Sequence, residues 1–130
     1  MMVVDTSVIF AILQGEPEAY AFTKILGEEE FVFLPSSVLV EASILAIKRS
    51  LGKDLDALIG ALNPEIVPLD ETLAYLAADA HRAYGKGRHK ANLNFVDCIV
   101  YATAKYLKVP LLHKGNDFSY TDITTPDQSS

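Results

Sequence analysis

MMVVDTSVIFAIL, residues 1–13, joins a short apolar run to a helical pattern across Asp5, Thr6 and Ser7. An apolar run that ends at a polar turn is typical of a buried strand, and Asp5 can cap the helix that we expect from about Val8. A strand that leads directly into a helix is the first part of a β-α-β unit. The stretch therefore predicts an α/β fold.

The same alternation of strand and helix patterns continues along the chain. Further strands are predicted at residues 31–34, 66–69 and 110–112, with a short one near Ile123. Helices are predicted at residues 18–26, 38–50, 54–62, 71–84 and 95–107, with a break at Gly52. Buried strands between helices indicate a parallel sheet covered on both faces. Ligands bind such sheets at the carboxyl ends of the strands, where Asp5 and Asp117 lie.

Length and composition fit one cytoplasmic domain. The chain has 130 residues, half of them hydrophobic, and its single cysteine, Cys98, excludes an internal disulfide. Its apolar runs fall short of the roughly 20 residues that cross a bilayer, and no basic region precedes the first run. We expect a protein that is neither exported nor membrane-bound, with a domain over residues 1–124 and a flexible tail over 125–130.

The net charge of −6 opposes binding of nucleic acid through a broad basic face, because Lys and Arg contacts to phosphate usually supply that affinity. Four carboxylates in a metal site would account for most of this charge and leave −2. One glycine-containing segment, residues 85–90, concentrates positive charge and should form an exposed loop. The charge therefore weakens a nucleic-acid role without excluding it.

Three carboxylates, Asp5, Glu41 and Asp97, interrupt apolar runs. An ionised carboxylate is costly in such surroundings unless positive charge compensates it. The positions three and four residues from Glu41 and Asp97 carry no basic side chain, so the charge must come from a distant residue or an ion. Oxygen ligands without a histidine or cysteine set suit Mg²⁺, or Mn²⁺ as a substitute, rather than zinc. Such an ion activates water for attack on a phosphodiester.

Each acidic residue also has a structural explanation. Asp5 can cap its helix, Asp97 can close a capping box with Asn94, and Asp117 fits an ordinary turn. Glu41 would need a distant Arg or Lys. Each explanation is reasonable alone, but together the four positions favour a site.

Four segments resemble the motifs of PIN domains of the VapC toxin type, from VapBC toxin–antitoxin systems. They are VDTS (4–7), SVLVE (37–41), GRHKANLNFVDC (87–98) and LLHKGNDF (111–118). The likeness runs from residue 3 to about residue 123, and its last two segments are the specific ones. The resemblance implies a three-layer α/β/α sandwich with a central parallel β-sheet.

The resemblance also implies function. It indicates a Mg²⁺-dependent endoribonuclease, the toxin of a type II system, which forms a homodimer and is inhibited when an antitoxin segment crosses its active-site groove. Asp5 and Asp97 would bind the metal directly, while Glu41 and Asp117 would act through water or position the nucleophile. Supporting roles are expected for Ser7 and Asn94, and RNA contacts for Lys86, Arg88, His89, Lys90 and Lys114.

Two other functions stay open at this point. One is a PIN-like module without catalysis that only binds partners, although a domain without activity has no reason to keep carboxylates in apolar surroundings. The other is a metal-dependent phosphatase. A haloacid-dehalogenase-like phosphatase requires a second aspartate two residues after the first, where this chain has Ser7.

Overall fold

The computed structural model describes residues 1–126. The part of the expected tail at residues 127–130 lies outside the described residues. The elements follow in the order β1 (Met2–Val4), α1 (Thr6–Leu13), α2 (Ala19–Gly27), β2 (Val32–Pro35), α3 (Ser36–Lys48), α4 (Gly52–Leu62), β3 (Glu65–Val67), α5 (Glu71–Tyr84), α6 (Phe95–Leu107), β4 (Leu111–Leu112) and the 3₁₀ helix η1 (Phe118–Tyr120).

The strands form one parallel sheet in the order β3-β2-β1-β4. Val3 pairs with Phe33 on one side and with Leu111 on the other, so β1 is an interior strand. Its valines are fully buried, as expected for a strand covered on both faces. Since β2 and β4 lie on opposite sides of β1, the strand order reverses there, and the crevice at such a point is a usual ligand site.

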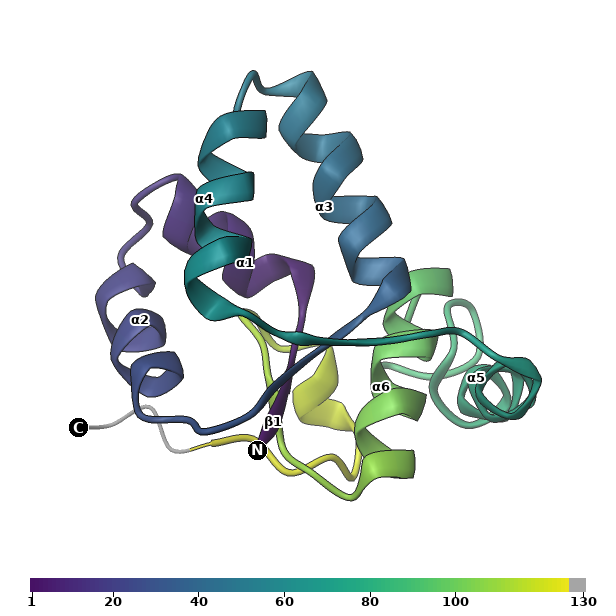
Figure 1. Ribbon diagram of the computed structural model, residues 1–130. Coiled ribbons are helices and arrows are strands. Elements are labelled where there is room, and N and C mark those ends of the chain that lie inside the picture. Colours follow the sequence, from purple (N-terminus) through teal and green to yellow (C-terminus); the bar gives the residue numbers. More distant parts are fainter. Residues whose placement is uncertain (127–130) are drawn as a thin grey trace.

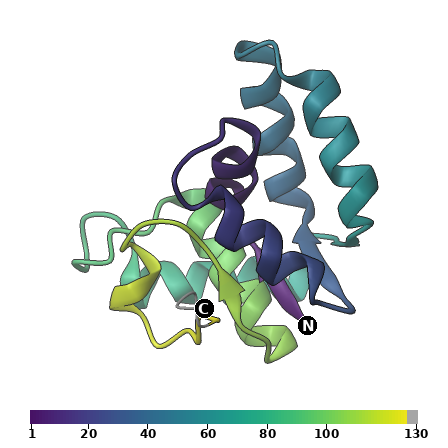
Figure 2. The ribbon, with the colours of Figure 1, turned by 90° about the vertical axis from the view of Figure 1, so that its left-hand side faces the viewer.

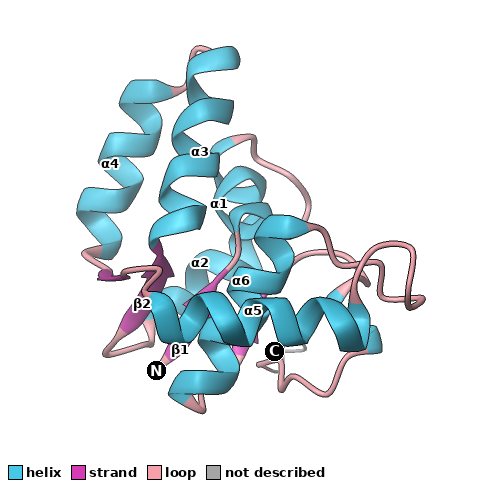
Figure 3. Ribbon diagram, turned by 90° about the vertical axis from the view of Figure 1, so that its right-hand side faces the viewer, coloured by secondary structure: helices cyan, strands magenta, loops and turns pink. Residues whose placement is uncertain are grey.

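Helices cover both faces of the sheet. Figure 1 shows α1 and α2 on the left of β1, and α6 with α5 outside it on the right. The side views agree, with α2 in front in Figure 2 and α5 in front in Figure 3. One apolar core joins the strands to these helices. The predicted three-layer α/β/α arrangement is therefore confirmed.

The hairpin of α3 and α4 extends beyond the carboxyl ends of β1 and β2, at the top of Figure 1. Helix α3 follows β2 directly, because Pro35 in extended conformation is followed by Ser36 at the first helical position. The two helices separate at Ser50, which has a positive φ of 57°, and Gly52 is the first residue of α4 rather than the break.

The predicted strand near Ile123 is wrong. The chain forms η1 at Phe118–Tyr120 and is irregular around Ile123, where the Thr121 hydroxyl donates to the Phe118 carbonyl and accepts from the Ile123 amide. These local bonds fix a turn, and one backbone bond, from the Leu111 amide to the Thr124 carbonyl at 2.9 Å, ties the segment to β4. Within residues 1–126, no helix is long and apolar enough to span a membrane.

Candidate active site

The four predicted carboxylates line one groove of about 360 Å³ at the carboxyl end of the sheet. Asp5 follows β1, Glu41 lies on α3, Asp97 is in the first turn of α6, and Asp117 lies beyond β4. Ser7 and Asn94 line the same groove. The structure therefore brings together side chains that are up to 112 residues apart in the sequence, next to the reversal between β1 and β4.

Asp5 is held firmly and is only 7% exposed. Its Oδ2 accepts from the Ser7 amide at 3.2 Å and from the Ser7 hydroxyl at 2.6 Å. The same hydroxyl accepts from the Lys114 amide at 3.0 Å, so Ser7 ties the end of β1 to the segment after β4. Burial raises the pKa of Asp5, the Ser7 bonds oppose that rise, and the charge of Asp117 adds to it.

Asp97 closes the predicted capping box. The Asn94 side chain accepts from the Asp97 amide at 2.9 Å, and Asp97 Oδ2 accepts from the Asn94 amide at 3.1 Å. Desolvation raises the pKa of Asp97 to about 6, and the charges of Asp5, Asp117 and Glu41 contribute to the rise. The structural explanation for Asp97 is thus correct, and the carboxyl also belongs to the cluster.

Glu41 and Asp117 complete the groove in more open positions. Glu41 is half-buried and Asp117 is exposed. The apolar run around Glu41 is not buried as expected, because its neighbours Val40 and Ile44 are exposed on α3. Within residues 1–126, none of the ion pairs includes any of the four carboxylates. The sequence left a distant basic residue and an ion as the two sources of compensating charge, and the described residues supply no basic partner in an ion pair.

The predicted RNA-contacting residues are distributed unevenly. Lys114 lines the groove, but its ammonium pairs with Glu16 and Glu18. The predicted basic loop, residues 85–90, does not line the groove. Backbone bonds between Lys86 and Leu93 and between Leu93 and Tyr84 close its base.

Sequence reasoning missed Arg49, which reaches the groove from the end of α3. A helical signal existed, since Glu41, Leu45 and Arg49 follow one another at four-residue intervals and therefore share a face. The signal could not be used without knowing that this face borders the groove.

The donor set fits a hard cation. No three His, Cys, Asp or Glu side chains of residues 1–126 already lie close enough together to enclose a metal ion. Mg²⁺ does not need such a cage, because it keeps several waters and binds one or two carboxylates together with substrate phosphate. Asp5 and Asp97 each use one oxygen for a structural bond and leave the other for a ligand. Their raised pKa values reflect burial and uncompensated negative charge that a cation would relieve.

Comparison with known proteins identifies the family of the chain. The PIN domain family model matches residues 2–123. Ribonuclease VapC30 of Mycobacterium tuberculosis is 36% identical over 127 residues, covering 95% of this chain and 97% of its own. Ribonuclease VapC of Mycolicibacterium smegmatis is 37% identical over 125 residues, covering 94% and 97%.

A solved structure of Mycobacterium tuberculosis VapC20, described as a sarcin-ricin loop cleaving toxin, has a TM-score of 0.77 at 17% identity, covering 97% of this chain and 98% of that one. A toxin–antitoxin complex from Klebsiella pneumoniae gives 0.76 at 16% identity, covering 97% of each chain. These two likenesses concern the fold, while the matches above extend to sequence over nearly the whole length. The chain belongs to the PIN domain family, among the VapC ribonucleases.

Proposed function

We propose that this protein is a Mg²⁺-dependent endoribonuclease, the toxin of a type II toxin–antitoxin system in the cytoplasm, with the carboxylate groove as its active site. The observation that carries the proposal is the convergence of Asp5, Glu41, Asp97 and Asp117 without a basic partner in the described chain. Relatives named ribonucleases over nearly the full length support the reaction class.

We assign different roles to the residues of the groove. Asp5 and Asp97 would hold Mg²⁺, with Glu41 and Asp117 around them to bind its waters. Bound there, the ion supplies positive charge to the phosphoryl oxygens and makes water more acidic. Ser7 fixes the Asp5 carboxylate, and Asn94 fixes that of Asp97, so neither must reorganise when substrate arrives. Glu41 and Asp117, which line the groove beside this pair, would orient the attacking water.

The surface beside the groove suits protein partners. Phe95 is 80% exposed, and Val40, Ile44, Ile47 and Leu69 are exposed around α3 and the start of α6. Apolar side chains gathered in this way mark protein interaction sites more often than free surface. We assign this apolar patch, defined by these five residues, to a homodimer contact. The antitoxin is expected to cover the groove itself, and solved toxin–antitoxin complexes with this fold support such a partner.

The test is cleavage of cellular RNA by purified protein, freed of any bound inhibitor, with Mg²⁺ and with EDTA. Discrete fragments should appear only with Mg²⁺ and should disappear with Asp97→Asn. Asp56→Asn is the matched control, because Asp56 is an exposed aspartate on α4 outside the groove. Folded, inhibitor-free protein that cuts nothing with Mg²⁺ or Mn²⁺ would favour the module without catalysis. Release of phosphate from monoesters in place of RNA cleavage would favour the phosphatase.

A further inference from the structure

The carboxylate groove continues beyond the carboxylates. From Glu41 it follows α3 past Leu45 to Arg49, with α1 on the opposite side. Eight residues of helix correspond to about 12 Å at 1.5 Å per residue. Arg49 therefore lies about two helical turns along the groove from Glu41.

Arg49 is held in place although it is exposed. Its Nη1 donates to Gln14 Oε1 at 2.9 Å, and its guanidinium lies over the Phe10 ring, 5.3 Å from the centroid. A guanidinium has five N–H donors in a fixed plane, so one bond to Gln14 leaves others for a ligand. Stacking on an aromatic ring limits the motion of the plane, which lowers the entropy lost on binding.

Arg49 and the other cation in the groove differ in the partners of their charged groups. Among the described side chains that line it, five are carboxylates and two are cations, Arg49 and Lys114. Lys114 is paired with Glu16 and Glu18, whereas the Arg49 partner Gln14 is neutral. Arg49 thus supplies the uncompensated fixed positive charge along an otherwise acidic groove. A polyanion bound in the groove would therefore be attracted to the guanidinium of Arg49.

We propose that Arg49 binds a backbone phosphate of the RNA, distant from the one that is cut, and so aligns the strand along the groove. This inference rests on the proposed ribonuclease function and adds a substrate contact to it. Arginine suits the role because its planar fork matches phosphate oxygens and its contact is independent of base identity.

Binding of a fluorescent single-stranded RNA, measured by anisotropy across a KCl series with Mg²⁺, tests the proposal. The parent protein carries Asp97→Asn to prevent cleavage. Arg49→Gln should weaken binding about fivefold at low salt, and should reduce the slope of log K against log salt by about 0.7, the value for one phosphate contact to a single strand. Arg49→Lys keeps the charge and should retain the slope with intermediate affinity.

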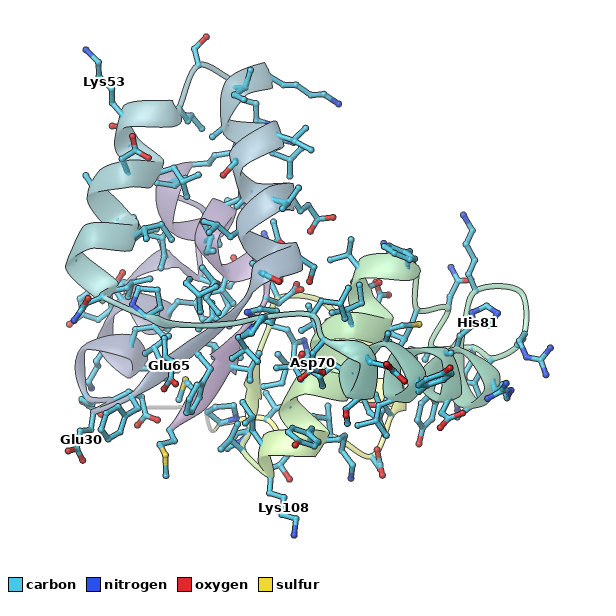
Figure 4. The ribbon with its side chains drawn as sticks, turned by 45° about the vertical axis from the view of Figure 1, so that its right-hand side comes forward. Glu30, Lys53, Glu65, Asp70, His81 and Lys108 are labelled. Carbon is cyan, nitrogen blue, oxygen red and sulfur yellow. The ribbon has the colours of Figure 1, made fainter. Side chains whose placement is uncertain are left out.

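Lys53→Gln is the matched control for charge. Lys53 is exposed at the far end of the hairpin of α3 and α4, as Figure 4 shows, and it does not line the groove. It should leave both affinity and slope at the parent values. In the active protein, Arg49→Gln should raise KM with little change in kcat, as expected for a contact made equally before and during the reaction.

The outcomes separate the two proposals. If the active protein cuts RNA but Arg49→Gln keeps the parent slope, the role of Arg49 is refuted and the ribonuclease stands. A lower melting temperature with an unchanged slope assigns Arg49 a structural role and also refutes the proposal. If the parent protein binds no RNA at any salt concentration and the active protein cuts none, both proposals fail.

Discussion

Replacing Asp97 with asparagine should abolish the proposed activity and also stabilise the fold at neutral pH. The reason lies in the pKa of Asp97, which the fold raises from 3.8 to about 6 by burial and by the charges of Asp5, Asp117 and Glu41. Between these two pKa values the folded protein binds more protons than the unfolded chain. Stability from this carboxyl is therefore present below about pH 4 and is lost as the pH rises through about 6.

The magnitude follows from the shift. A shift of two pKa units corresponds to about 3 kcal/mol when solvent screening is ignored. The side chain is only half-buried, so solvent screening reduces this to about 1.5 kcal/mol. Asparagine keeps an oxygen that can accept from the Asn94 amide, but it loses a favourable negative charge near the helix N-terminus, worth about 0.5 kcal/mol. The net gain is about 1 kcal/mol, or roughly 3–5 °C in melting temperature for a domain of this size.

The assay is thermal unfolding followed by circular dichroism in EDTA, from about pH 4 to about pH 8, where the advantage of the variant should grow as the pH rises. Asp70→Asn is the matched control, because Asp70 caps α5 through the Leu73 amide and lies outside the groove (Figure 4). Asparagine caps a helix about as well as aspartate, so this control should change little. An Asp97→Asn variant that is less stable at neutral pH, or whose advantage does not depend on pH, would refute the reasoning.

Three further predictions concern the metal, Ser7 and the apolar patch. Mg²⁺ should raise the melting temperature, with stabilisation of about 2.7 kcal/mol at a hundredfold excess over Kd. Asp5→Asn should lose most of this effect, and an equal response of both proteins would contradict Asp5 as a ligand. Ser7→Ala should destabilise the fold by about 1–2 kcal/mol and raise the Mg²⁺ concentration needed for cleavage, because it frees the Asp5 carboxylate. An unchanged Mg²⁺ requirement would assign Ser7 a structural role alone. Phe95→Asp should convert a dimer to a monomer in light scattering while the circular dichroism spectrum of the folded protein is kept, and a persistent dimer would place the contact elsewhere.

Elements with local signals could be predicted well. The predicted bounds of α5 and α6 agree with the structure because Asp70 and Asn94 cap these helices through their own side chains. The segment around Ile123 lacks such a signal. Its path depends on a hydroxyl of Thr121 and on one backbone bond to β4, which an apolar pattern does not contain.

The residues of the site also differ in whether the sequence carries a signal for them. Asp5, Glu41 and Asp97 could be identified because a charge within an apolar run requires an explanation that neighbouring residues do not give. Arg49 is an ordinary surface residue in the sequence, and its place in the groove follows from the direction of the hairpin of α3 and α4. Phe95 shows the opposite error, since its apolar pattern predicts burial, but no described element covers the start of α6.

The structural and functional explanations of the carboxylates are compatible, because a carboxylate has two oxygens. Asp97 closes a capping box with one oxygen, and Asp5 caps α1 with one of its own. A cap alone would not require these residues to lie beside Glu41 and Asp117, where burial and mutual repulsion raise the pKa of Asp5 and of Asp97. Asp70 caps α5 without such neighbours, so the fold can cap a helix outside the cluster. The raised pKa values mean that the ionised carboxylates destabilise the fold. A cation-dependent active site requires such a concentration of negative charge.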